Sequence, residues 1–186
     1  MSITNKKIAV IGLGYVGLPL TLAFAKKYST IGFDVNSKRI AELNNGTDVT
    51  KEVHHNELVS AISNSFSLAL TDDSSQIQNS DIYIVTVPTP VDQQKLPDLT
   101  FLLEATKMLG AMISPGNIVI YESTVYPGCT EHDCVPILES TSGLKYNIDF
   151  FCGYSPERIN PGDRVNTLTT IKKVTSGSTP EIAEIV

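Results

Sequence analysis

Three glycines in one short segment, Gly12-x-Gly14-x-x-Gly17, form the motif in this chain best suited to binding a phosphorylated ligand. Gly12 permits a tight turn, Gly14 lets the backbone approach a pyrophosphate with no Cβ in the way, and Gly17 allows a helix to pack closely on a strand. A helix that begins here offers free N–H groups and the positive end of its dipole to the anion. The motif therefore predicts a site for the phosphates of a dinucleotide.

A carboxylate follows the glycines at the distance that a dinucleotide site requires. Asp34 lies 34 − 12 = 22 positions after Gly12, and the fingerprint expects an acidic residue about 20 positions on, bonded to the ribose 2′-hydroxyl. A carboxylate there repels a 2′-phosphate, so NAD is favoured over NADP. Arg39 can reach the adenosine side, and it can also bind a phosphate. The alternatives are a helix-capping role for Asp34 and a solvated surface charge for Arg39.

Apolar runs alternate with amphipathic stretches along the whole chain, and these elements must position the motif. Strands are expected at 7–11, 30–34, 66–70, 81–87, 117–121, 149–154 and 170–175. Helices are expected at 16–27, 37–44, 57–63, 99–109 (capped by Asp98) and 129–140. This alternation predicts an α/β domain with a doubly wound parallel sheet covered on both faces, a Rossmann-like NAD-binding domain.

The composition excludes several classes of protein. Of 186 residues 41% are hydrophobic and 18% charged, which predicts a packed core rather than disorder. The net charge of −6 argues against nucleic acid as the main partner. No apolar run reaches the roughly 18 residues of a membrane span, and no signal peptide begins the chain, so we expect no membrane partner and a cytoplasmic location.

The three cysteines, Cys129, Cys134 and Cys152, predict free thiols rather than disulfides, because their number is odd. Cys129 and Cys134 flank His132, but the spacing is unusual for a metal site and a fourth ligand is missing. We therefore expect no metal.

Three loops follow predicted strands, at 87–90, 122–128 and 154–163, where open α/β sheets bind their ligands. Polar groups on these loops are expected to converge near the cofactor, and they are Thr89, Ser123, Thr124 and Glu157. The alternative for Thr124 is a turn hydroxyl at a strand end. The alternative for Glu157 is a surface charge after a proline turn.

Four motifs in register resemble one family, the nucleotide-sugar 6-dehydrogenases of the UDP-glucose/GDP-mannose dehydrogenase family. The motifs are Ile11-Gly-Leu-Gly-Tyr-Val-Gly17, Val87-Pro-Thr-Pro90, Ser123-Thr-Val125 and Ser155-Pro-Glu157. The runs at 121–128, 155–163 and 95–99 look more like the UDP-N-acetylhexosamine (UDP-GlcNAc/UDP-GalNAc) branch. Products of that branch feed capsule, O-antigen or Vi-type surface polysaccharides.

The resemblance implies a reaction and a set of site residues. Family members oxidise the C6 alcohol of a UDP-sugar to a carboxylate in two steps, with two NAD consumed and a covalent intermediate on a cysteine. By resemblance, Thr124 lies near the nicotinamide and the catalytic water, and Glu157 does acid/base work around hydrolysis. The implied cofactor-binding residues are Gly12, Gly14, Tyr15, Val16, Gly17, Asp34, Arg39, Pro88, Thr89, Ser123 and Thr124.

One departure from the family concerns the nucleophilic cysteine, which sits in a later domain of family members, beyond Val186 of this chain. We therefore expect residues 1–186 to be the N-terminal NAD-binding domain of a longer enzyme, inactive alone, whose full-length form is a homodimer. Two alternatives stay open. One is the Rossmann domain of another β-hydroxyacid-type dehydrogenase, such as 6-phosphogluconate dehydrogenase, and the other is a stand-alone NAD-binding module without catalysis.

Overall fold

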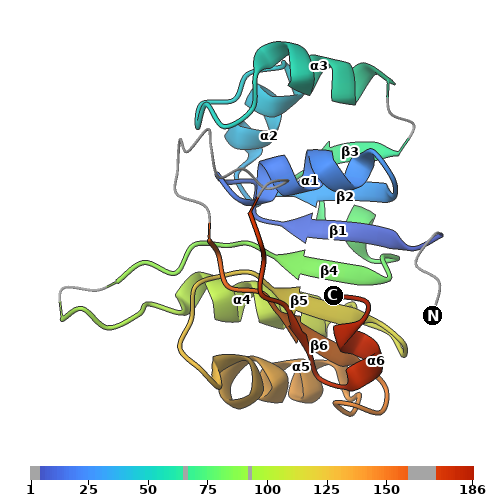
Figure 1. Cartoon of the computed structure of the whole chain (residues 1–186), viewed down its shortest axis with the longest axis vertical. Helices are drawn as coiled ribbons and strands as arrows, with labels where there is room; N and C mark the ends of the chain where they lie inside the picture. Colours follow the sequence, from blue (N-terminus) through green and yellow to red (C-terminus); the bar gives the residue numbers. More distant parts are fainter. Residues whose placement is uncertain (1–4, 65–66, 92–93, 159–170) are drawn as a thin grey trace.

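A single twisted sheet forms the centre of the molecule in the computed structural model, which describes residues 5–64, 67–91, 94–158 and 171–186 (Figure 1). Within these ranges the strand order is β3-β2-β1-β4-β5-β6-β7, with β7 antiparallel to β6 and the others parallel. The strands are β1 (Lys7–Ile11), β2 (Ser29–Phe33), β3 (Leu68–Thr71), β4 (Ile82–Val85), β5 (Ile118–Tyr121), β6 (Phe151–Tyr154) and β7 (Ser176–Gly177). The order reverses between β1 and β4, so the predicted doubly wound sheet is confirmed.

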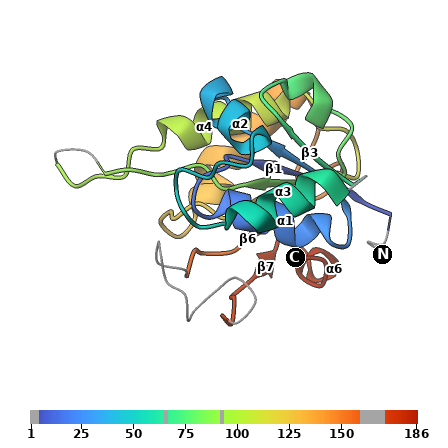
Figure 2. The ribbon, with the colours of Figure 1, turned by 90° about the horizontal axis from the view of Figure 1, so that it is seen from above.

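Helices cover both faces of this sheet. They are α1 (Gly17–Ala25), α2 (Ser37–Asn44), α3 (His55–Asn64), α4 (Thr100–Gly110), α5 (Val135–Ser142) and α6 (Pro180–Ala183), with a 3₁₀ turn η1 (Ser74–Ile77) and a π turn η2 (Thr130–Cys134). Figure 2 shows α2 and α4 on one side of the sheet and α1, α3 and α6 on the other. Among the described residues, no helix is long and apolar enough to cross a membrane.

The central strands β1, β4 and β5 read as nearly continuous apolar runs because they are buried on both faces. In β1, Ala9 and Ile11 face the cluster that contains Leu102 of α4, whereas Ile8 and Val10 face the cluster with Leu20 of α1. The residues of β4 and β5 alternate between the same two clusters. Side chains of successive strand residues point to opposite faces, so one strand contributes to two layers of core.

The predicted strand at 170–175 is wrong for the residues that the structure describes there. Residues 171–175 form no strand, and the last strand is β7, which pairs with Gly153 and Tyr154 of β6. A Cβ at Gly153 would lie 3.2 Å from the Ser176 carbonyl oxygen, so the glycine lets this backbone approach β6 closely. Residue 170 and residues 159–163 of the predicted loop lie outside the described ranges.

The helices differ from their predicted bounds mainly at their ends. The helix expected at 129–140 divides into η2 and α5, and Pro136 is the second residue of α5, directly after the π turn. The N-cap of α4 is Leu99, which makes no side-chain cap, but Asp98 just before it accepts a hydrogen bond from the Thr100 N–H at 2.9 Å and so satisfies one free N–H at the start of the helix. The short α6 and η1 were not predicted.

Candidate functional site

A pocket of about 890 Å³ opens at the carboxyl ends of β1, β2, β4 and β5. This is the edge at which an open α/β sheet binds its ligand, on either side of the point where the strand order reverses. Ten of the eleven residues predicted to bind the cofactor line it, and they are Gly12, Gly14, Tyr15, Val16, Asp34, Arg39, Pro88, Thr89, Ser123 and Thr124. Glu157 lines it as well, so the fold brings both predicted catalytic residues to the same pocket.

The glycine loop connects β1 to α1 at the base of the pocket. Gly12 has a φ of +93°, a left-handed conformation that favours glycine. A Cβ at Gly14 would meet no atom within 4 Å, so the backbone here faces open space into which a diphosphate fits. Gly17 does not line the pocket: a Cβ there would lie 1.8 Å from the Gly12 carbonyl oxygen, which makes Gly17 the contact between helix and loop.

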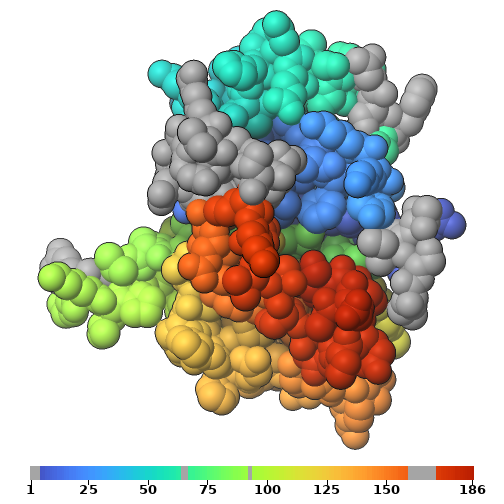
Figure 3. Space-filling view, in the orientation of Figure 1, coloured from blue at the N-terminus to red at the C-terminus, as the bar shows by residue number. Residues whose placement is uncertain are grey.

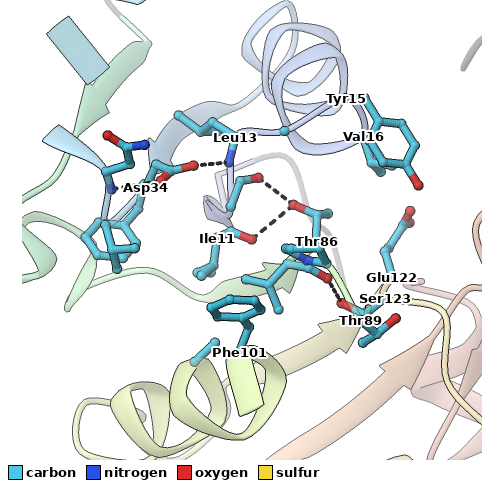
Figure 4. Close-up of a pocket in the computed structure, with 18 of the residues that line it drawn as sticks. Ile11, Leu13, Tyr15, Val16, Asp34, Thr86, Thr89, Phe101, Glu122 and Ser123 are labelled. Carbon is cyan, nitrogen blue, oxygen red and sulfur yellow. Dashed lines mark hydrogen bonds between the residues drawn. The ribbon is translucent and has the colours of Figure 1, made fainter. Parts of the chain in front are cut away.

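Thr86, which directly follows β4, holds this loop in place. Its hydroxyl donates to the carbonyl oxygens of Ile11 and Gly12, at distances of 3.0 and 2.7 Å (Figure 4). The side chain is buried, and it fills the space that a side chain at Gly17 would need. The sequence analysis missed Thr86, because a threonine after a strand carries no signal of a contact 75 positions away.

Asp34 follows β2 and lies beside the glycine loop, as the spacing predicts. Its Oδ2 accepts a hydrogen bond from the Leu13 N–H at 2.8 Å, and its Oδ1 accepts one from the Asn36 N–H at 2.9 Å (Figure 4). The cap of α2 is Asn36, whose side chain accepts from the Arg39 N–H. The helix-capping alternative for Asp34 is therefore wrong, because another side chain does that work.

Arg39 is buried rather than solvated, with 7% of its surface exposed. Its Nε donates to the Leu13 carbonyl oxygen at 3.0 Å, and its Nη2 forms an ion pair with Asp48 at 2.8 Å. Nη1 is buried and has no hydrogen-bond partner among the described residues. The surface-charge alternative for Arg39 is thus wrong. Asp48 was missed, because residues 47–57 gave no prediction.

Two hydroxyls tie together the loops that follow β4 and β5. Thr89 Oγ1 donates to the Thr124 carbonyl oxygen at 2.6 Å, and Ser123 Oγ donates to the Val87 carbonyl oxygen at 2.6 Å. The side chain of Thr124 is exposed on the pocket side of this junction. These two bonds hold the Thr124 backbone against the loop that follows β4.

Negative charge collects at the end of the pocket where Glu157 lies. Burial raises the pKa of Tyr15, and the carboxylates of Glu157 and Glu52 raise it further. The phenol therefore stays protonated at neutral pH and keeps its capacity to donate a hydrogen bond. The backbone N–H of Arg158 donates to Glu157 Oε1 at 2.6 Å.

One residue that lines the pocket, Glu122, forms a largely buried ion pair that the sequence analysis missed. Glu122 directly follows β5 and pairs with Lys173, from the segment before β7. Burial raises the pKa of Glu122, the Lys173 ammonium opposes that rise, and Glu157 adds to it. In Figure 3 the red C-terminal segment lies against the orange segment that follows β6. Only tertiary structure brings Lys173 to Glu122, which lines the pocket.

The residues present fit NAD better than a metal. The open space beside Gly14 suits a diphosphate, and the Asp34 carboxylate suits a ribose hydroxyl. In the described part of the chain, no three His, Cys, Asp or Glu side chains gather to hold an ion. Cys129 is buried, and burial, followed by the charges of nearby groups, raises its pKa to about 12. Such a thiol is a poor metal ligand and a poor nucleophile.

Comparison with known proteins shows which family this chain resembles. The model of the UDP-glucose/GDP-mannose dehydrogenase family, NAD binding domain, matches residues 6–186. The chain is 59% identical to a UDP-N-acetyl-D-glucosamine 6-dehydrogenase of Pseudomonas aeruginosa over 180 residues, which cover 97% of this chain and 42% of the relative. It is 54% identical to the Salmonella typhi enzyme of that name, with 99% and 42% covered.

A solved structure of a related dehydrogenase also matches the fold of this chain. The UDP-D-ManNAc dehydrogenase from Pyrococcus horikoshii superposes with a TM-score of 0.86 at 31% identity, over 96% of this chain and 43% of that one. The chain thus spans about two fifths of the length of these relatives. These matches favour the nucleotide-sugar dehydrogenases over the 6-phosphogluconate dehydrogenase alternative.

Proposed function

Because the chain belongs to the UDP-glucose/GDP-mannose dehydrogenase family, we propose that it is the NAD-binding domain of an enzyme that oxidises C6 of a UDP-N-acetylhexosamine. The cofactor of this family's domain is NAD. One observation carries the proposal: a single pocket joins the glycine loop, Asp34, Thr124 and Glu157. The prediction that residues 1–186 are one domain of a longer enzyme forms part of the proposal.

We assign the two ends of the cofactor from the polar groups of the pocket. The diphosphate lies at Gly14 and the first turn of α1, and the adenosine ribose lies at Asp34. The nicotinamide end then lies toward Thr124 and Glu157, on the other side of the strand-order reversal. NAD supplies the hydride acceptor, and the protein supplies position, charge and proton transfer.

The chain's own residues divide the chemistry between them. The hydrogen bonds of Thr89 and Ser123 hold the loop that carries Thr124. Thr124 places its hydroxyl beside the nicotinamide. Glu157 exchanges protons during hydrolysis, and Tyr15 remains a hydrogen-bond donor beside it. The cysteine nucleophile that the resemblance implies belongs to a part of the enzyme beyond this chain.

The names of the relatives support the substrate class that we propose. Two of them are named UDP-N-acetyl-D-glucosamine 6-dehydrogenase, and a third, 52% identical, is Protein CapL from Staphylococcus aureus. We therefore propose a UDP-N-acetylhexosamine substrate and a role in surface polysaccharide synthesis. A cytoplasmic location accords with three buried free thiols. The full-length homodimer stays a prediction.

Two measurements test this function. Calorimetric titration of the chain with NAD is expected to show saturable binding, and absence of binding would contradict the proposal. The enzyme that carries this domain is then screened with UDP-N-acetylglucosamine, UDP-N-acetylgalactosamine, UDP-glucose and GDP-mannose, with NADH absorbance as the readout. Two NADH per UDP-N-acetylhexosamine are expected; turnover of GDP-mannose alone would overturn the substrate class.

A further inference from the structure

Asp48 is a buried carboxylate whose surroundings hold it in one position. Its side chain is 1% exposed. Oδ2 accepts hydrogen bonds from the N–H groups of Glu52 and Val53, both at 3.0 Å. Oδ1 accepts from the Thr50 hydroxyl at 2.7 Å and the Thr50 N–H at 3.1 Å. The loop between α2 and α3 therefore supplies most of the donors that this carboxylate needs.

The remaining contact of Asp48 is the guanidinium of Arg39. Arg39 Nη2 lies 2.8 Å from Asp48 Oδ1 and 3.5 Å from the Thr50 hydroxyl. The side chain of Arg39 is 8% exposed, so solvent screens this pair little. Burial alone raises the pKa of Asp48, but hydrogen bonds from Thr50, Val53 and Arg39 outweigh it and lower the pKa below its usual value. The carboxylate is consequently ionised at neutral pH.

One backbone residue joins this ion pair to the expected ribose site. The Leu13 N–H donates to Asp34, and the Leu13 carbonyl oxygen accepts from Arg39 Nε. Asp34 and Arg39 thus lie on the two sides of a single residue of the glycine loop, and both line the pocket. An arginine in this place is the group that accommodates a 2′-phosphate in NADP enzymes. Here its charge is already paired.

We propose that Asp48 determines the choice between NAD and NADP by holding Arg39 in a neutralised ion pair, so that no free cation remains beside the ribose. Asp34 repels a 2′-phosphate directly, and Asp48 removes the arginine that would attract one. Asp48 is a positioning residue, since it acts through Arg39. This inference rests on the proposed placement of the ribose at Asp34.

The decisive experiment compares two variants of the chain, Asp34→Ala and Asp34→Ala/Asp48→Asn, by calorimetric titration with NAD and with NADP. The asparagine keeps one of the two oxygen acceptors that the loop uses and removes the charge. Relative to Asp34→Ala alone, we expect the added Asp48→Asn to raise the affinity for NADP by about tenfold, equivalent to about 1.4 kcal/mol. The affinity for NAD should change little. The gain should shrink at high salt, since it comes from a freed cation and a phosphate.

Two further variants test the same inference if Asp48→Asn disturbs the loop between α2 and α3. Adding Arg39→Gln to the double variant should abolish the NADP gain. Arg39→Gln in the otherwise natural chain should weaken NAD and NADP by the same factor, because its charge is not available to a phosphate. An unchanged NADP-to-NAD ratio in the folded double variant, or a selective loss of NADP in Arg39→Gln, would overturn the inference. Absence of NAD binding to the natural chain would instead refute the proposed function.

Discussion

Lys173 pairs with Glu122 across 51 positions of sequence, at the carboxyl end of β5. The pair is largely buried, with exposed side-chain fractions of 18% and 9%. Burial nevertheless keeps the pKa of Glu122 above its usual value. Burying the ionised Glu122 carboxylate in the pocket therefore lowers the free energy of unfolding, and the Lys173 ammonium reduces this loss.

Lys173→Met should therefore destabilise the domain in a pH-dependent way. At pH 8 we expect the free energy of unfolding to fall by about 2 kcal/mol, because an ionised Glu122 is left buried without its cation. Lys173 lowers the pKa of Glu122, so removing it raises that pKa further, and the loss is full above the pKa of Glu122 in the variant. The loss diminishes as the pH falls through that pKa toward the lower pKa of Glu122 in the natural chain.

Urea unfolding at pH 8 and pH 5 measures this effect. The control is Glu122→Gln/Lys173→Met, which has no buried charge and should recover most of the stability at pH 8. A loss of equal size at both pH values, and in the double variant, would show that Lys173 acts through packing rather than charge.

Two glycines, Gly14 within the loop and Gly17 at the start of α1, should respond differently to alanine. Gly17→Ala places a Cβ 1.8 Å from the Gly12 carbonyl oxygen and should lower the free energy of unfolding by about 3 kcal/mol. Gly14→Ala meets open space and has no positive φ, so the fold should persist. Its methyl group intrudes on the diphosphate, and NAD affinity should fall by about tenfold or more. Thermal unfolding and calorimetry together separate the two cases; equal melting temperatures would refute the packing role of Gly17.

Removing the carboxylate of Asp34 should affect the two cofactors unequally. Asp34→Ala is expected to weaken NAD by about tenfold, because the ribose hydroxyls lose their acceptor. The affinity for NADP should fall less, since the repulsion between Asp34 and the 2′-phosphate disappears as well. The control is Asp34→Asn, which keeps one oxygen for the N–H groups of Leu13 and Asn36. Equal losses for NAD and NADP in calorimetric titrations would contradict the assigned ribose contact.

The hydroxyl of Thr89 should matter for the loop that carries Thr124. Thr89→Val keeps the shape but leaves the Thr124 carbonyl oxygen without its donor, at an expected cost of about 1 kcal/mol. Hydrogen exchange of residues 122–128 should become faster. Thr89→Ser retains the donor and should behave like the natural chain. If valine and serine variants exchange alike, the bond does not hold the loop.

Local patterns predicted much of the domain. The strands β1, β4 and β5 were recognisable because a strand buried on both faces must be apolar throughout. The glycine spacing predicted the loop that lines the pocket, and the distance from Gly12 to Asp34 predicted the carboxylate beside that loop, whose contact with a ribose stays a prediction. In both cases the residues lie within one β-α-β unit, so their spacing along the sequence predicts their spacing in the fold.

The sequence by itself thus determined the sheet, the glycine loop and the acidic residue that follows it. Only the tertiary structure decided the partners of Arg39 and Glu122, the position of β7, and the contact of Gly17 with the Gly12 carbonyl oxygen. Asp48 and Lys173 carry no periodic or spacing signal, because they lie on irregular segments. A charge pairs with whichever opposite charge the folded backbone brings close, and that proximity comes from packing the whole sheet, not from the order of neighbouring residues.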